Sequence, residues 1–221
     1  MTDYATQRSS MVDSQVRPSD VTDRRIPRAM LEIPREAFAR GNRQAIAYAD
    51  GHLPLSDTAR DNRVLLAPRL LAKLIQHLDI AAGDTVLDIG CGTGYSTAIL
   101  ARLARTVVAI EADAGLAAQA ETTLKNLGID NAKVIHGPHE VGALGMGPYD
   151  AILVNGAVAD MPRLLLDQMK DHGRLAAVAV EGGSGRAVLW RRFAMQFDRR
   201  TLFDAEAPLL PGFMPAKAFV F

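Results

Sequence analysis

The sequence predicts an α/β protein with a doubly wound, mostly parallel seven-stranded sheet, an antiparallel C-terminal edge and an N-terminal helical extension. Three observations predict this class. Short, nearly unbroken apolar segments alternate with helical segments between residues 84 and 180, which is typical of a parallel sheet covered on both faces. After residue 180, a glycine-rich turn separates two apolar segments and indicates an antiparallel pair. Before residue 80, the apolar spacing is helical.

Length and composition set the outer limits. A chain of 221 residues suits one α/β domain with an extension, and 48% hydrophobic with 23% charged residues is an ordinary globular balance. Lysines plus arginines equal aspartates plus glutamates, so the zero formal charge argues against long-range steering toward nucleic acid or anionic lipid. A local basic patch around Arg24, Arg25 and Arg28 stays open.

The single cysteine, Cys91, excludes an internal disulfide, and no Cys/His cluster has the spacing of a zinc site. The polar amino terminus lacks the apolar region of a secretory signal, and no apolar run approaches the ~20 residues that span a bilayer. We therefore expect a soluble cytoplasmic protein without a metal, membrane partner or nucleic acid.

In the N-terminal part, the first ~12 residues are expected to be frayed. Residues 21–33 have helical spacing, with Thr22 or Asp23 as the predicted cap. A loop follows, and a second helix is predicted to begin at about Pro68.

From residue 84 on, strands and helices alternate. The predicted strands span residues 85–89, 106–112, 133–137, 149–157 and 174–180, and the predicted helices span 95–104, 114–127 and 161–171. Beyond them lie two further strand-like segments, at 187–193 and 217–221. These seven apolar segments account for the predicted sheet.

A glycine-rich turn follows the first of these strands, in the stretch VLDIGCGTGYS at residues 86–96. The dinucleotide fingerprint requires G-x-G-x-x-G, but here Tyr95 occupies the position of the third glycine. This weakens the case for a nicotinamide cofactor without excluding one. Asp88 would repel a pyrophosphate but suits a cofactor that carries an ammonium group. Glu111 ends the next strand, where a carboxylate can accept both hydroxyls of a ribose.

This combination over residues 84–180 resembles the class I S-adenosylmethionine-dependent methyltransferases. The resemblance implies a Rossmann-like methyltransferase fold with S-adenosyl-L-methionine as cofactor. It implies that Gly90 and Gly92 let the backbone pass under the methionine part, that Asp88 orients the loop and the amino group, and that Glu111 holds the ribose.

The predicted cofactor-binding residues are Asp88, Gly90, Cys91, Gly92, Gly94, Tyr95, Glu111, Gly137 and His139. Simpler interpretations stand beside these roles. Asp88 alone is compatible with a helix cap and Glu111 alone with a solvated strand end. Cys91 is interpreted as a small side chain in the turn and not as a nucleophile, because no histidine follows it at an interpretable spacing.

The N-terminal third resembles the opening of the protein-L-isoaspartate O-methyltransferases, through the stretches MVDSQV, VTDRRIPRAMLEIPREAF and AYADGHLPL. The matching residues include Asp23, Arg25, Ala29, Met30, Pro34, Arg35, Phe38, Ala47, Tyr48, Asp50, Leu53 and Pro54. This family methylates the α-carboxylate of isoaspartyl residues in damaged proteins, which implies a protein or peptide substrate. Residues 1–80 would form the helical extension and substrate-side loop, and residues 81–221 the cofactor-binding domain, within one compact unit.

Two departures from the family pattern concern the site. Leu66 stands where the family has a serine at the reaction site, after the stretch SDTARDNR, which is longer and lacks the family's glycines. The third strand ends in Gly137-Pro138-His139 where the family has G-D-G, so contacts to adenine would come from the backbone or from His139.

The identity of the catalytic residue therefore stays open between the Leu66 position and Asn155, which closes the fourth strand and either faces the transferred methyl or simply begins a loop. A carboxylate is already ionised at pH 7, so its methylation requires no general base. A leucine in place of the serine would leave a polar group of the substrate without its hydrogen bond, at a cost of about 1–3 kcal/mol. Leu66 is compatible either with the reaction site or with the core. The alternatives are a methyltransferase with a different acceptor and a cofactor-binding module without turnover.

Overall fold

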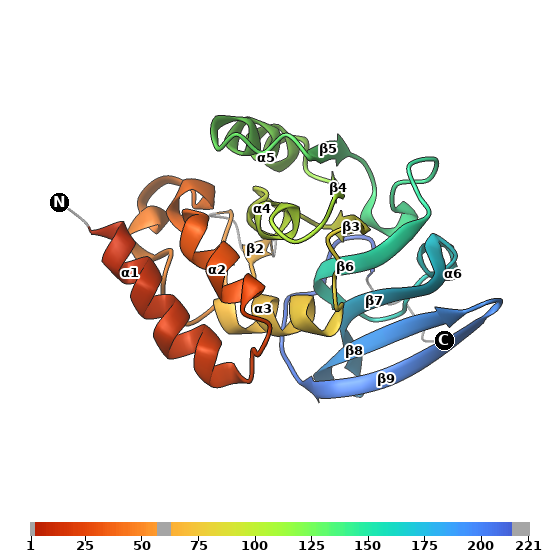
Figure 1. Cartoon of the computed structure of the whole chain (residues 1–221). Helices are drawn as coiled ribbons and strands as arrows, with labels where there is room; N and C mark the ends of the chain where they lie inside the picture. The colour runs from red at the N-terminus through yellow and green to blue at the C-terminus, as the bar shows by residue number, and fades with distance from the viewer. Residues whose placement is uncertain (1–2, 57–62, 214–221) are drawn as a thin grey trace, which may run out of the picture.

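A computed structural model describes residues 3–56 and 63–213 (Figure 1). Its central seven-stranded sheet has the order β5-β4-β3-β6-β7-β8-β9, in which β3 to β7 run parallel and β8 and β9 antiparallel. The strands span Thr85–Ile89 (β3), Thr106–Glu111 (β4), Ala132–His136 (β5), Tyr149–Val158 (β6), Met169–Glu181 (β7), Ser184–Phe193 (β8) and Gln196–Asp204 (β9). The predicted fold class is confirmed.

Strand order places a topological switch point in the middle of the sheet. From β3 the chain moves outward to β4 and β5, and it then returns to the other side of β3 as β6. In open α/β sheets, ligands bind outside the carboxyl ends of the strands at such a point. The glycine turn follows β3 there, so the fold puts it in the expected place.

Both sheet faces are covered, because successive strand residues point to opposite sides. Val86 and Leu87 are adjacent in β3 but belong to different apolar clusters. The first cluster includes residues of the helices Pro68–His77 (α3), Tyr95–Ala101 (α4) and Ala114–Asn126 (α5), together with the N-terminal extension. The second includes the short helix Arg163–Leu166 (α6).

The N-terminal extension is folded from Asp3 onward, so the prediction that the first ~12 residues are frayed is wrong for residues 3–12. Helix α1 spans Tyr4–Met11 and is capped by the carboxylate of Asp3, which accepts from the amide of Thr6 at 3.0 Å. Its Met11 side chain is buried in the core, and Arg8 pairs with Glu36 at 3.1 Å. A few long-range contacts therefore order a segment whose composition is mostly polar.

Further along, a π-helical turn at Val12–Val16 and a 3₁₀ turn at Arg17–Ser19 lead to helix α2, Arg25–Glu32. The cap position of α2 is Arg24, without a side-chain cap hydrogen bond, so neither predicted residue is the cap. Asp23, one residue earlier, accepts from the amide of Arg25 at 3.0 Å. The amide of Thr22 instead donates to the side chain of Gln76 at 2.6 Å, so Thr22 does not cap this helix.

Arg35, which lies in a 3₁₀ turn at residues 35–38 and is fully buried, links parts of the extension to one another and packs the extension against α4. Its guanidinium donates to the carbonyls of Ala47 at 2.8 Å and Leu66 at 2.9 Å and lies 4.7 Å from the centre of the Tyr95 ring. A further 3₁₀ turn at residues 41–46 and a two-stranded sheet of Leu53–Pro54 (β1) and Val64–Leu65 (β2) complete the extension before α3 begins at the predicted Pro68.

The structure corrects two predicted elements. The helix expected over 161–171 is limited to α6, because Met169 already pairs with Tyr149 as part of β7. The last strand of the sheet is β9, which the sequence reasoning missed, and the strand-like residues 217–221 lie outside the described residues.

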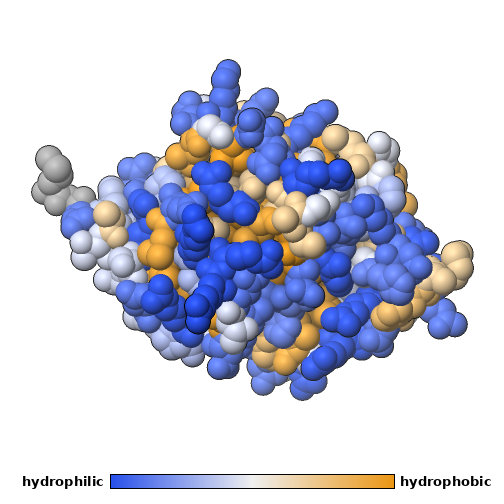
Figure 2. All heavy atoms as spheres, in the orientation of Figure 1, coloured by the Kyte–Doolittle hydropathy of each residue, from blue (hydrophilic) through white to orange (hydrophobic). Residues whose placement is uncertain are grey.

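The surface carries no single dominant patch on the face shown in Figure 2, where polar side chains surround scattered apolar ones. No helix in the described ranges is long and apolar enough to cross a membrane. Within the same ranges, no group of three His, Cys, Asp or Glu side chains is arranged to hold a metal ion.

Candidate functional site

The glycine turn between β3 and α4 has a backbone that favours glycine. Gly90, Gly92 and Gly94 have φ angles of 72°, 58° and 96°, which other residues rarely adopt. The amide of Gly90 donates to the carbonyl of Ile110 at 2.8 Å, which ties the turn to the neighbouring strand. The turn therefore presents bare backbone at the switch point of the sheet.

Asp88 lies at the end of β3 and is fully buried. Its carboxylate accepts from the hydroxyls of Ser96 at 2.8 Å and Thr97 at 2.6 Å, and from the side-chain amide of Asn155. Burial raises the pKa of Asp88 to about 6, although the hydrogen bonds from Thr97 and Ser96 act in the opposite direction. In this structure, Asp88 fixes the first turn of α4 against β6.

Glu111 ends β4 and faces the same turn. One carboxylate oxygen accepts from the amide of Gly92 at 2.7 Å and from the guanidinium of Arg63, and the other lies 3.2 Å from His139 Nε2. Burial alone would raise the pKa of Glu111, but the hydrogen bond with His139 and the charge of Arg63 outweigh it and hold the pKa at about 2. Glu111 is therefore a buried, fully ionised carboxylate at neutral pH and not a solvated strand end.

Arg63 was missed by the sequence reasoning. It directly precedes β2, only 5% of its surface is exposed, and its guanidinium forms a buried ion pair with Glu111. The sequence offers one signal, an arginine directly before the stretch Val64-Leu65-Leu66, but local spacing does not show which carboxylate such an arginine reaches.

Two leucines cover the turn. A Cβ placed on Gly90 would lie 2.8 Å from a methyl of Leu210, and one placed on Gly92 would lie 2.6 Å from a methyl of Leu55. The remaining cavity beside the turn has a volume of about 10 Å³ and is lined by residues that include Leu66 and Asn155. This is at most the space of one water molecule.

The segment that carries Leu210 crosses the carboxyl end of β6. The amide of Ala157 donates to Pro208 at 2.8 Å, and the amide of Leu210 donates back to the carbonyl of Ala157 at 2.9 Å. His139 is fully buried beneath this segment, with Nδ1 3.0 Å from the carbonyl of Pro211. Its ring is thus held between Glu111 and the C-terminal segment.

The other predicted cofactor residues bond to or pack against residues of the chain itself. Gly137 donates its amide to the carbonyl of Glu111 at 3.0 Å. Burial raises the pKa of the Cys91 thiol, which agrees with its interpretation as a small side chain and not as a nucleophile. Gly94 lets α5 approach, since a Cβ there would lie 3.2 Å from that of Ala120. Tyr95 is buried and faces the extension, 5.5 Å from the ring of Phe38.

The two catalytic candidates also lie inside the protein. Leu66 is 2% exposed and belongs to the first apolar cluster. Asn155 is part of β6 and directs its side-chain amide to Asp88 and to the carbonyl of Ile89 at 3.5 Å, so it neither begins a loop nor faces solvent. Both positions adjoin the small cavity beside the turn, and this brings them to the same place as Gly90.

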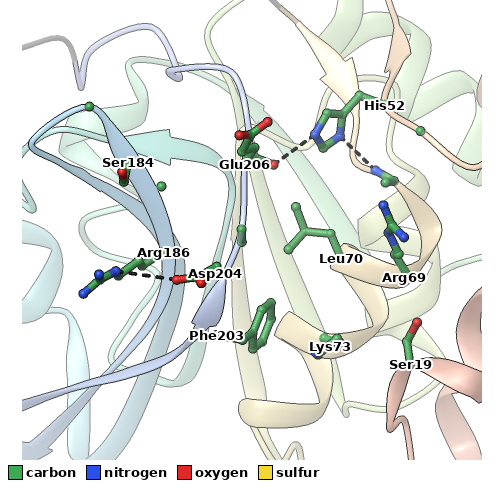
Figure 3. Close-up of a pocket in the computed structure, with 15 residues that line it drawn as sticks. Ser19, His52, Arg69, Leu70, Lys73, Ser184, Arg186, Phe203, Asp204 and Glu206 are labelled. Carbon is green, nitrogen blue, oxygen red and sulfur yellow. Dashed lines mark hydrogen bonds and ion pairs between the residues drawn. The ribbon is translucent and has the colours of Figure 1, made fainter.

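A cavity of about 880 Å³ lies elsewhere, between α3 and the hairpin of β8 and β9 (Figure 3). His52 bridges its rim, 3.0 Å from the carbonyl of Glu206 and accepting from the amide of Ala67 at 3.0 Å. The cation of Arg186 pairs with Asp204 at 3.6 Å, and Figure 3 shows this pair on the β8–β9 side. None of the predicted cofactor residues lines this cavity.

The fit of S-adenosyl-L-methionine to these residues is a matter of chemistry and of volume. Asp88, the bare glycine turn and Glu111 supply the polar groups that a sulfonium nucleoside requires. Pockets for ligands of this size measure about 300–1,000 Å³, whereas the cavity beside the turn measures about 10 Å³. In this conformation, the polar groups suit the chemistry of the cofactor, but the cavity is too small to hold it.

Known proteins resemble this chain over most of its length. The sequence profile of the protein-L-isoaspartate(D-aspartate) O-methyltransferase family matches residues 6–198. A protein-L-isoaspartate O-methyltransferase of Koribacter versatilis is 35% identical over 98% of this chain and 97% of its own length, and one of Methanoregula boonei is 39% identical over 76% of each.

Solved structures agree. A protein-L-isoaspartate O-methyltransferase superposes with a TM-score of 0.83 at 25% identity, over 93% of this chain and 66% of that longer one. A Plasmodium falciparum structure described as such an enzyme in complex with S-adenosyl-L-homocysteine has the same fold, with a TM-score of 0.78 at 22% identity over 92% of this chain and 97% of that one. The profile match and the curated relatives together show that this chain belongs to the protein-L-isoaspartate O-methyltransferase family.

Proposed function

We propose that this chain is an S-adenosyl-L-methionine-dependent O-methyltransferase that methylates a carboxylate of a protein or peptide, with the isoaspartyl residue as acceptor. The observation that carries the proposal is the family match over residues 6–198, which includes both the acceptor-side N-terminal stretches and the glycine turn. The relatives' names support the reaction and the acceptor. The predicted cytoplasmic location stays a prediction.

The proposed cofactor residues are Asp88, the glycines of the turn and Glu111. We infer that residues 1–80 supply the acceptor side and residues 81–221 the cofactor side of one compact unit. Because an ionised carboxylate needs no general base, the chain's own task in the reaction is to align the acceptor and exclude water. The burial of Leu66 and Asn155 supports a role in the exclusion of water more than a role in proton transfer.

The test has two parts. Calorimetry with S-adenosyl-L-homocysteine measures whether the cofactor's thioether relative binds. Transfer of a labelled methyl group is then measured on an isoaspartyl peptide, with the same peptide containing ordinary aspartate as control. Binding together with transfer to the isoaspartyl peptide alone supports the proposal, and a folded protein with no affinity for the thioether contradicts it.

A second candidate is a methyltransferase of this family with a different acceptor. Leu66, at the position of the family's serine, favours it, because an apolar side chain there offers no hydrogen bond to an isoaspartyl substrate. This candidate predicts binding of the thioether without transfer to the isoaspartyl peptide, and transfer to another carboxylate in an acceptor screen. Binding without transfer to any acceptor would instead identify a cofactor-binding module.

A further inference from the structure

Glu111 is saturated with donors from the protein itself. The guanidinium of Arg63 and the amides of Gly92, Ala112 and Asp113 donate to its two carboxylate oxygens, and His139 Nε2 lies 3.2 Å from one of them. A carboxylate has about four lone-pair positions. Two ribose hydroxyls therefore have no place at Glu111 until at least one of these groups leaves.

Arg63 is the group whose departure would also clear space. Its Nη2 lies 3.3 Å from the position that a Cβ on Gly90 would occupy, so the guanidinium lies directly against the turn. The backbone amides of Gly92, Ala112 and Asp113 belong to the turn and to the end of β4, and leaving would require those elements to change. Arg63 directly precedes β2, which belongs to a separate two-stranded sheet.

The donors of Arg63 are incompletely satisfied. Its Nε is buried and has no hydrogen-bond partner among the residues that the structure describes. An unpaired buried donor destabilises the arrangement that contains it. The closed arrangement around Glu111 therefore lacks the complete hydrogen bonding of a permanent ion pair.

Arg174 provides the contrast within the same chain. Its Nε donates to the carbonyl of Leu78 at 2.7 Å, and its Nη2 donates to the Asp84 carboxylate at 2.7 Å and to the carbonyl of Asp79 at 3.1 Å. This ion pair joins β7 to the segment before β3 and lies away from the glycine turn. The Nε of Arg174 therefore has a protein acceptor, whereas the Nε of Arg63 has none within the described part of the chain.

We propose that Arg63 determines the affinity of this chain for its cofactor, because its guanidinium occupies the place of the ribose hydroxyls at Glu111 and has to leave before the ribose binds. This inference rests on the proposed function. A ligand that binds only the open fraction of a protein has its apparent affinity lowered by that fraction. Removal of the guanidinium should therefore raise the affinity.

The experiment is calorimetry of the full chain with S-adenosyl-L-homocysteine, comparing the wild type with Arg63→Met. We expect Arg63→Met to bind at least about tenfold more tightly. The matched control is Arg174→Gln, which breaks a partly buried arginine–aspartate pair away from the turn and should bind like the wild type. An arginine with a merely structural role would give the opposite sign, since its loss would loosen the site and weaken binding.

The double variant Arg63→Met/Glu111→Gln tests whether the gain acts through Glu111. We expect it to lose the tightening, because the ribose hydroxyls then have no carboxylate to bind. If the tightening persists without the carboxylate, the inference is wrong.

A second variant covers the case in which Arg63→Met does not fold. Arg63→Gln removes the charge and keeps a neutral donor, and it should also tighten binding. A wild type that binds as tightly as these variants, or more tightly, overturns the inference and leaves the proposed function standing. Folded proteins that all lack affinity for the thioether overturn both.

Discussion

Leu66→Ser distinguishes a core residue from a residue at the reaction site. The side chain is 2% exposed within the first apolar cluster, and its own carbonyl accepts from the buried guanidinium of Arg35. Truncation of a buried leucine to alanine costs about 2–5 kcal/mol, and serine adds a hydroxyl that has to find a partner. We therefore expect the free energy of unfolding to fall by about 3–5 kcal/mol.

Urea unfolding followed by circular dichroism measures this change, with an unaltered dependence on urea as the check that only stability has moved. For a chain of this size, the same loss lowers the melting temperature by about 6–20 °C. The control is Leu144→Ser, at a leucine that is 56% exposed, which should change stability by less than about 0.5 kcal/mol. A loss below about 1 kcal/mol together with increased transfer to an isoaspartyl peptide would refute the reasoning and place Leu66 at the reaction site.

Three further predictions concern the turn and its acids. Relative to Asp88→Asn, the wild type should lose about 3 kcal/mol of unfolding free energy as the pH rises from about 4 to about 6, because the native state holds the Asp88 proton more tightly than the unfolded chain does. Urea unfolding of both proteins across this pH range measures the difference. A difference that does not change with pH would mean that the carboxyl is not buried. For Glu111 the pH dependence has the opposite sign, because its native pKa lies near 2. The stability advantage of the wild type over Glu111→Gln should be greatest above about pH 4.5 and should decline as the pH falls toward 2. An advantage that grows on acidification would contradict the contacts with His139 and Arg63. Gly92→Ala should lower the free energy of unfolding by at least about 1 kcal/mol more than Gly183→Ala does, because both glycines have positive φ but only at Gly92 would the added methyl meet side chains within 4 Å, with Leu55 nearest at 2.6 Å. Equal unfolding midpoints would mean that Leu55 moves aside freely.

The sequence predicted the elements whose signals are local. Strand β3, the glycine turn and the acid at the end of β4 follow one another within 27 residues, and each has its own pattern of apolar, small or charged residues. Because the carboxyl ends of neighbouring parallel strands meet at one edge of the sheet, these local signals were sufficient to place Asp88 near Glu111.

Predictions failed where distant contacts decide. Helix α1 is polar by composition, and its order depends on Met11 in the core and on Arg8 reaching Glu36. Arg63 and Glu111 are 48 positions apart, and the sequence between them contains no periodic signal that would pair them. Similarly, the apolar residues of 161–171 suit a helix as well as a strand, and pairing of Met169 with Tyr149 selects the strand.

Thr93, in the glycine turn, donates its hydroxyl to the carbonyl of Phe38 at 2.6 Å, and Arg35 reaches from the same stretch to Leu66 and to the ring of Tyr95. The shape of the glycine turn is thus partly specified by residues that precede it by more than fifty positions. Removal of residues 1–50 from the chain, or their replacement by the corresponding residues of a relative, should deform the turn. In this chain, the N-terminal stretch and the turn therefore have to be engineered together.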